Sequence, residues 1–267
     1  MLAVQQSFER IGARVAVTRV PRPRGPFALA PSAVRVNVVR DGHGELFLID
    51  RLWNVRLTVP DADPADRHLL LVAEHAGPDD RFSRFLCGHD ERAWFAAAVP
   101  EAQEPDTVQA AKDALKPEEV WDAIRAHDLP RDQWNLRWTA AFVRQGEWFF
   151  LPRPSMQVDP KEVLCNEPIQ RGGGRAHWCE NLYRTGGVEV FVSAAFPNGL
   201  TAQQYWMLDR AQRGNQRWES RVRDAEVYVR GLIRHPDHAT LKLPDWHRVV
   251  MNTETRARAM QDLAFLD

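Results

Sequence analysis

Two pairs of cysteine and histidine residues have a spacing that suits metal binding. Cys87 and His89 are two residues apart, as are His177 and Cys179. If both pairs lie on strands, each projects two ligands from one face, because strand side chains alternate with a period of two. Together the four would form a Cys₂His₂ set of the kind that holds structural zinc. The alternatives are buried cysteines with ordinary hydrogen-bonding histidines, or a nucleophilic Cys–His pair.

A second group of polar residues lies in the segment His235-Pro-Asp-His238. A tight turn at Pro236-Asp237 would bring both imidazoles and the Asp237 carboxylate together. Such a set can coordinate a divalent ion or act as a general base with an orienting partner. We therefore treat His235, Asp237 and His238 as candidate catalytic residues. The alternative is an ordinary β-turn in which Asp237 bonds its own backbone.

The loop Gln170–Arg175 contains three successive glycines between Arg171 and Arg175. Glycine permits close approach of main-chain donors to a ligand, so this loop suits a phosphate, a nucleic-acid backbone or an acidic peptide. The loop leads directly to His177, so the two features can belong to one site. A flexible surface loop in an arginine-rich protein is the alternative.

Basic residues gather again in residues 210–234, where seven arginines face three acidic residues. Trp218 and Tyr228 lie among them, and arginine with aromatic side chains is typical of single-stranded nucleic-acid binding. We take Arg217, Trp218 and Arg221, with Arg171 and Arg175, as candidate binding residues. A solvated charged face is the alternative, because a sequence pI near 6.8 is low for a dedicated nucleic-acid binder.

The common catalytic signatures are absent from the sequence. It contains no Walker A loop, GxGxxG, GxSxG, HExxH or CxxC motif. His89-Asp-Glu91 matches half of the zinc-deaminase signature, but the PCxxC half is missing. Nucleotide-dependent enzymes, common serine hydrolases and zincins are therefore disfavoured.

Alternating and turn-forming residues predict the elements that position these groups. The pattern predicts a hairpin over residues 34–50 and further strands at 54–59, 68–73, 82–88 and 94–99. Later strands are expected at 136–144, 148–152, 188–194, 227–234, 239–243 and 246–251. Helices are expected at 106–115, 117–127, 201–213 and from Thr253. This is an α+β chain with mostly antiparallel sheets and about four helices.

Composition divides the chain into four expected parts. Residues 1–33 form a basic arm rich in proline and arginine, and 34–100 an antiparallel β sub-domain. Residues 101–130 form an acidic helical connector, and 131–267 an α+β sub-domain with an Arg- and Trp-rich surface. The acidic connector between basic segments is compatible with self-association.

The chain has 267 residues and a net charge of -1, and its proportions of hydrophobic and charged residues are those of a globular protein. No run of 18 apolar residues or signal peptide is present, so we expect a cytoplasmic protein of bacterial type, without membrane contact. Three cysteines argue against a disulfide framework.

Two functions fit these patterns. The first is a non-enzymatic binding or adaptor protein that recognises a protein or nucleic-acid partner through its Arg- and Trp-rich surface. The second is a metal-dependent hydrolase, such as a nuclease, with a His/Asp/Cys site. Zinc is the candidate cofactor and fits either function.

Overall fold

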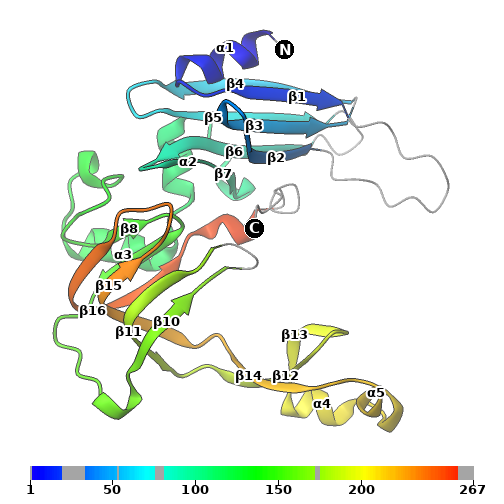
Figure 1. Ribbon diagram of the computed structural model, residues 1–267, viewed down its shortest axis with the longest axis vertical. Coiled ribbons are helices and arrows are strands. Elements are labelled where there is room, and N and C mark those ends of the chain that lie inside the picture. The colour runs from blue at the N-terminus through cyan, green and yellow to red at the C-terminus, as the bar shows by residue number, and fades with distance from the viewer. Residues whose placement is uncertain (1, 20–33, 53, 76–80, 172–174, 258–267) are drawn as a thin grey trace.

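The computed structural model describes residues 2–19, 34–52, 54–75, 81–171 and 175–257. Within these ranges the chain forms sixteen strands in four mostly antiparallel sheets, with five α-helices (Figure 1). The predicted α+β class is therefore confirmed. None of the helices in this part of the chain has the length and apolar character needed to cross a membrane.

The first half contains two sheets that share a core. One has the order β1 (Val15–Arg19), β3 (Gly44–Arg51), β2 (Val34–Asp41), and β2 and β3 form the predicted hairpin. The other has the order β4 (Val55–Asp63), β5 (His68–His75), β6 (Arg81–Asp90), β7 (Ala93–Val99). These strands confirm the pattern expected for residues 54–99.

The structure differs from the expected arm over residues 2–19. Leu2–Arg10 form helix α1, and β1 pairs in parallel with β3. Val4, Phe8 and Ile11 recur at helical spacing and are buried against the shared core, so this segment is held by an apolar stripe. Residues 20–33, with the proline-rich part of the expected arm, lie outside the described residues.

The four-stranded sheet is buried on both faces, which explains the apolar run in β5. Leu69 and Leu71 face the core shared with the first sheet, while Leu70 packs against helix α2 (Val108–Ala114). The Thr107 side chain caps α2, one residue later than predicted. Helix α3 (Glu118–Ala126) packs against the second half of the molecule.

The second half is built on a six-stranded sheet. Its order is β10 (Leu164–Ile169), β11 (His177–Thr185), β15 (Glu226–Arg234), β16 (Leu241–Met251), β9 (Trp148–Pro152), β8 (Val143–Gln145). The two strands expected at 239–251 form the single strand β16. Pro244 lies between the two expected strands, and a register shift between the Val229–His247 and Gly231–Leu243 pairs accommodates it within β16.

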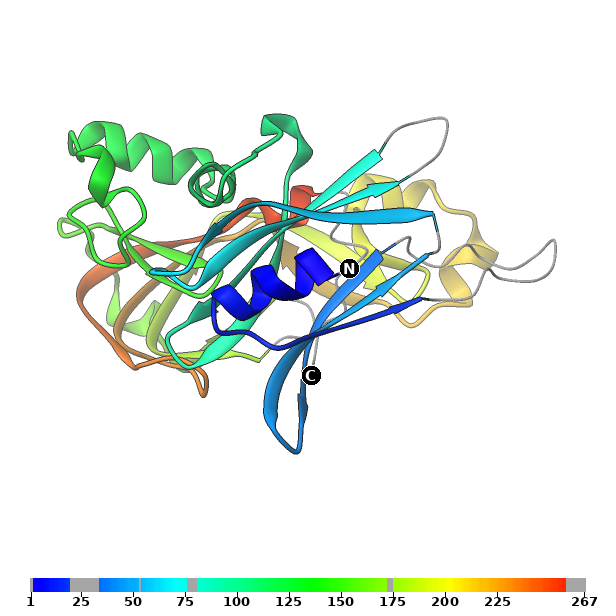
Figure 2. The same cartoon turned by 90° about the horizontal axis from the view of Figure 1, so that it is seen from above.

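Strands β11 and β15 lead out of this sheet into a smaller three-stranded sheet, which projects from the rest of the molecule (Figures 1 and 2). Its strands are β12 (Val188–Ser193), β13 (Phe196–Thr201) and β14 (Glu219–Arg223), with helices α4 (Ala202–Met207) and α5 (Arg210–Gly214). We call residues 188–223 the distal lobe. The capping box at Thr201 is as predicted, but the helix ends early because Asp209 begins a second capping box.

Short 3₁₀ helices complete the described elements: η1 (Glu101–Gln103), η2 (Arg131–Gln133), η3 (Pro160–Glu162) and η4 (Thr253–Arg256). The helix expected from Thr253 is limited to η4 in the described residues. The Glu254 side chain joins the two halves, because it accepts hydrogen bonds from the Ala98 main chain at 3.1 Å and from Arg171 at 2.6 Å.

Candidate functional site

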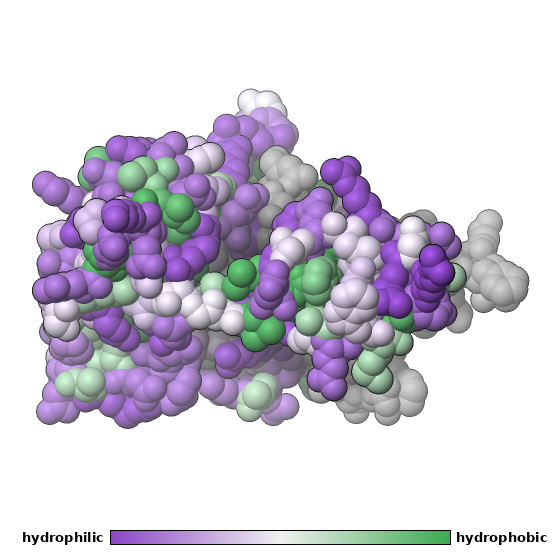
Figure 3. All heavy atoms as spheres, turned by 90° about the horizontal axis from the view of Figure 1, so that it is seen from below, coloured by the Kyte–Doolittle hydropathy of each residue, from purple (hydrophilic) through white to green (hydrophobic). Residues whose placement is uncertain are grey.

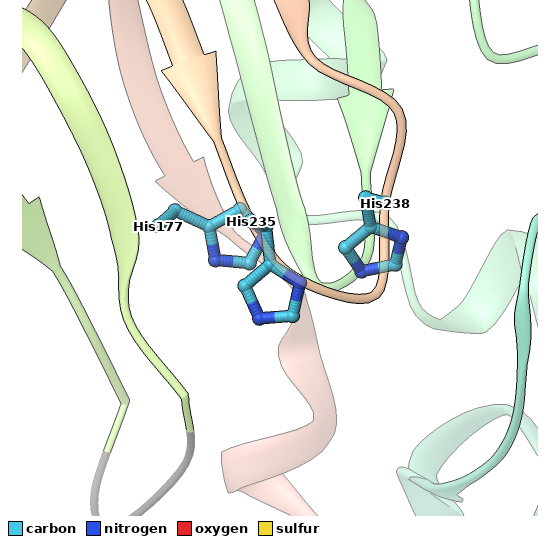
Figure 4. A group of neighbouring side chains, drawn as sticks. All are labelled: His177, His235 and His238. Carbon is cyan, nitrogen blue, oxygen red and sulfur yellow. The ribbon is translucent and has the colours of Figure 1, made fainter.

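Three histidines from two neighbouring strands meet at one end of the six-stranded sheet. His177 begins β11, and His235 directly follows the last residue of β15. Because Trp178 pairs with Arg234, the antiparallel register places His177 beside His235. The turn after His235 returns His238 towards both rings (Figure 4). One ring nitrogen from each of the three lies within 4.8 Å of the others, and we call them the histidine cluster.

The ring of His177 stacks on both other rings of the histidine cluster, and the rings of His235 and His238 are tilted relative to each other. The centroids of His177 and His235 are 4.2 Å apart at an interplanar angle of 22°, and those of His235 and His238 are 4.7 Å apart. Stacked imidazoles at these distances would repel one another if they were protonated. The packing therefore disfavours a state in which two neighbouring rings are protonated at once.

Several ring nitrogens of the cluster have no hydrogen-bond partner although they are buried. His177 is only 1% exposed, and neither its Nδ1 nor its Nε2 is hydrogen-bonded; the same holds for Nδ1 of His238. Buried polar atoms almost always have partners, because leaving one unsatisfied costs about 1–3 kcal/mol. His235 is anchored differently, since its Nδ1 accepts a hydrogen bond from the Asp237 main-chain N–H at 3.1 Å.

Burial keeps the cluster neutral near pH 7. Desolvation, with the charges of the other two histidines, lowers the pKa of His177 to about 3. Desolvation also lowers the pKa of His238 to about 4, and it lowers that of His235, where a main-chain hydrogen bond to Arg175 opposes the effect. A metal ion binds the neutral imidazole, so the cluster is in its ligating form at neutral pH.

The turn between β8 and β9 covers the cluster. Gly146 in this turn has a φ of +56°, and a Cβ placed on it would lie 3.1 Å from Nε2 of His238 and 3.8 Å from Nε2 of His177. A side chain here would occupy the space in front of two ring nitrogens. Glycine therefore serves both the backbone conformation and the access to the cluster.

A cavity of about 530 Å³ borders the cluster through Gly146, Asp237 and His238. It runs between the two halves of the molecule, since β6 and β7 residues line it together with residues around β8 and β9. Its charged lining includes Asp90, Lys116, Arg137, Arg144, Glu147 and Asp237. The volume is in the range of small-molecule sites.

Two carboxylates at the end of β6 lie between the cavity wall and the histidine cluster. Glu91, which follows β6, lies with its Oε2 3.8 Å from Nδ1 of His238 and accepts a hydrogen bond from the Ala239 main chain. Arg137 pairs with Glu91 at 2.6 Å and also contacts Asp90. A carboxylate next to a ligating histidine is the usual support for its orientation. Glu91 was visible in the sequence only as half of a deaminase signature, and Arg137 gave no signal.

Asp237 lies beside the cluster but not in it. Its carboxylate accepts hydrogen bonds from Arg175 at 2.9 and 3.2 Å, so the turn after β15 is tied to the glycine loop. The sequence therefore located the turn correctly, and the structure brings together two of its three candidate residues, His235 and His238, with His177.

The predicted Cys₂His₂ set does not form, and only His177 of its four residues joins the cluster. Cys87 is fully buried in the first half, where burial raises the pKa of its thiol. His89 packs edge-on against Trp94 at 4.9 Å and lines the cavity. Cys179 does share a strand face with His177, but it lies in the apolar core, and burial raises its pKa to about 12. Alternation along a strand determines on which face a side chain lies, but not whether it lies at the end of the sheet or in its apolar core.

The candidate binding residues are spread over two regions. Arg171 forms a buried ion pair with Glu254, while Arg175 pairs with Asp237 near the cluster. Residues 172–174 of the glycine run lie outside the described residues. Arg217, Trp218 and Arg221 belong to the distal lobe, where Trp218 is half-buried and Arg221 pairs with Glu219 at 2.9 Å. The expected surface is thus divided between the two ends of β11 and β15.

Comparison with known proteins adds no family to this geometry: no family model matches the chain, and no curated protein or solved structure is significantly similar to it.

Proposed function

We propose that the protein is a metal-dependent hydrolase that binds zinc on the histidine cluster and its substrate in the adjacent cavity. The observation that carries this proposal is the set of one buried and two half-buried imidazoles, kept neutral by desolvation, with one ring nitrogen from each within 4.8 Å of the others. Zinc accepts imidazole nitrogen at about 2.0–2.1 Å in tetrahedral geometry. Ligand atoms would then be roughly 3.3 Å apart, so binding draws the rings together by up to roughly 1.5 Å.

The number of protein ligands supports a catalytic rather than a structural ion. Structural zinc sites are closed by four protein ligands, whereas catalytic sites use three and leave one position open. The cluster supplies three, and His238 faces the cavity. A zinc ion with an open position supplies a water molecule of lowered pKa and polarises a bound carbonyl or phosphoryl group.

Other residues of the chain would support this chemistry. Glu91 lies 3.8 Å from Nδ1 of His238, close enough to orient that ring once a metal draws it in, and Arg137 holds Glu91 through an ion pair at 2.6 Å. Arg175 holds Asp237 at the mouth of the site. The basic side chains of the cavity lining, among them Arg144, are balanced by as many carboxylates, so the lining suits a polar substrate without selecting the sign of its charge.

The proposal is tested by titrating metal-free protein with Zn²⁺ in a calorimeter and then measuring hydrolysis of 4-nitrophenyl acetate and bis(4-nitrophenyl) phosphate. We expect one zinc per chain and zinc-dependent turnover of one substrate. His235→Ala should weaken zinc binding more than about 100-fold, since even outer-shell substitutions cost 10–100-fold. His127→Ala, which changes an exposed histidine away from the site, is the matched control.

Two results would overturn the proposal. If the folded protein binds no zinc, the metal site is wrong. If it binds zinc but hydrolyses neither substrate, the ion is structural and the hydrolase proposal fails. That second result would favour the alternative function, a non-enzymatic binding or adaptor protein, for which the distal lobe offers a surface.

A further inference from the structure

The distal lobe exposes large apolar side chains at its helical end. Trp206 is 66% exposed and Met207 is 79% exposed, both on α4. Trp206 is the most exposed tryptophan in the part of the chain that the structure describes. Viewed from below, hydrophobic residues lie among hydrophilic ones on the projecting side of the molecule (Figure 3). A neighbouring pair of such residues is a feature of binding surfaces.

Trp206 is held in place by the lobe itself. An aromatic cluster fills the lobe: Phe191 stacks on Tyr205 at 4.5 Å, and Tyr205 contacts Trp218 edge-on at 5.0 Å. Tyr205 also contacts the Trp206 ring edge-on at 5.2 Å. The exposed indole therefore projects from a packed support, and ordering it on binding costs little side-chain entropy.

One arginine lies over this indole, and two more occupy the same short segment of the chain. The Arg213 guanidinium lies 4.9 Å from the Trp206 ring centroid, and its main-chain carbonyl accepts a hydrogen bond from Trp218. Neither Arg213 nor the exposed Arg210 and Arg217 forms an ion pair with any residue in the described ranges. The one acidic residue in 202–218, Asp209, caps α5. This part of the lobe thus has a net positive charge.

We propose that the distal lobe binds single-stranded nucleic acid. One base stacks on the exposed face of Trp206, and Arg210, Arg213 and Arg217 contact the phosphates on either side. A supported aromatic ring in contact with Arg213, on a segment that also carries Arg210 and Arg217, fits an unpaired base and its charged backbone together. An acidic peptide would match the charges but not the flat indole, and a duplex keeps its bases stacked inside.

This surface is independent of the proposed hydrolase site. The histidine cluster lies at the start of β11 and the end of β15, whereas the distal lobe lies beyond their other ends. A failure of one proposal therefore leaves the other unaffected. The overall pI near 6.8 is compatible with the proposal, because the excess positive charge of residues 202–218 is offset by acidic residues elsewhere in the chain.

The test measures fluorescence anisotropy of labelled 20-nucleotide probes with the full-length protein: single-stranded DNA, single-stranded RNA and duplex DNA. We expect a single-stranded probe to bind at least tenfold more tightly than the duplex. Three phosphate contacts predict a slope of log affinity against log salt of about −2, given about −0.7 per contact on single strands.

Matched variants locate the site. Trp206→Ala should weaken binding about 5- to 150-fold, which corresponds to 1–3 kcal/mol per stacked base, and Trp206→Phe should restore most of it. Arg210→Gln with Arg217→Gln should flatten the salt slope by about 1.4. Trp138→Ala and Arg40→Gln remove an exposed tryptophan and an exposed arginine from the rest of the molecule and should leave the affinity unchanged.

Any of three results would overturn the proposal: no binding at 50 mM salt, equal affinity for duplex and single strand, or Trp206→Ala binding like the unchanged protein. Circular dichroism checks that each variant is folded. If Trp206→Ala unfolds the lobe, the affinity of Trp206→Phe and the salt slope of the arginine double variant still test the proposal. Both variants keep the aromatic residues that support the lobe.

Discussion

At the scale of single residues, Gly146 controls access to the histidine cluster. We predict that Gly146→Ala weakens zinc binding by at least about tenfold, because the added Cβ lies 3.1 Å from Nε2 of His238. Gly186→Ala is a matched control: Gly186 has a similar φ of +67°, but nothing lies within 4 Å of its Cβ position. Both variants carry the same backbone strain, so calorimetric titration of the two with Zn²⁺ isolates the steric effect. Equal affinities would show that the metal is not in front of Gly146.

The buried histidines also predict how stability depends on pH. His68 and His238 have folded-state pKa values of about 4, and His177 of about 3, all below the unfolded value of about 6.5. Between those values the unfolded chain binds more protons. The free energy of unfolding is therefore highest above pH 6.5 and decreases as the pH falls towards 4, by up to about 1.4 kcal/mol per unit for each histidine.

Urea unfolding of metal-free protein at pH 7.5, 6 and 5 measures this decrease. His238→Gln should remove one histidine's share of it and leave the remaining slope. An unfolding free energy that is the same at pH 7.5 and 5 would mean that these imidazoles are not buried in neutral form.

At the scale of elements, the four-stranded sheet depends on a glycine opposite a histidine. Gly88 on β6 pairs with His68 on β5, and a Cβ on Gly88 would come within 2.9 Å of Cγ of the His68 ring. We predict that Gly88→Ala destabilises the protein by about 1–3 kcal/mol through overpacking. Gly42→Ala, in the β2–β3 turn with open space around it, should change stability by less than about 0.5 kcal/mol. Denaturant unfolding of both variants checks the difference; equal values would mean that His68 moves freely.

Much of the element pattern could be predicted from the sequence, but the site could not be assembled from it. The strands of the first half follow from alternation and turns, which are local signals. The histidine cluster requires β11 to pair with β15, and the whole distal lobe lies between them in the chain. No local pattern indicates that pairing. Gly146 lies between the strands expected at 136–144 and 148–152, but nothing in the sequence placed it over His238.

At the scale of the whole molecule, Glu254 joins the two halves that enclose the cavity. Its carboxylate is buried and bonds both Arg171 and the Ala98 main chain. We predict that Glu254→Gln lowers the free energy of unfolding by about 1–3 kcal/mol, because it replaces a charge-assisted hydrogen bond to Arg171 by a neutral one. Glu118→Gln breaks an exposed pair with Arg125 and should cost less than about 1 kcal/mol. Similar losses in guanidinium unfolding of both variants would contradict this assignment.

The antiparallel pairing of β11 with β15 also bears on how such a chain can change over time. Thr185 pairs with Glu226, so the chain leaves the six-stranded sheet and re-enters it at adjacent positions. The two chain segments also approach closely here, because a Cβ placed on Gly187 would lie 2.7 Å from the Arg223 carbonyl oxygen and 3.0 Å from the Ala225 nitrogen. The distal lobe is thus an insertion in a hairpin, and a two-residue Asn-Gly turn could replace it without disturbing the strands on either side. Because no residue of 186–225 lines the cavity, we expect a protein shortened in this way to keep the cavity intact.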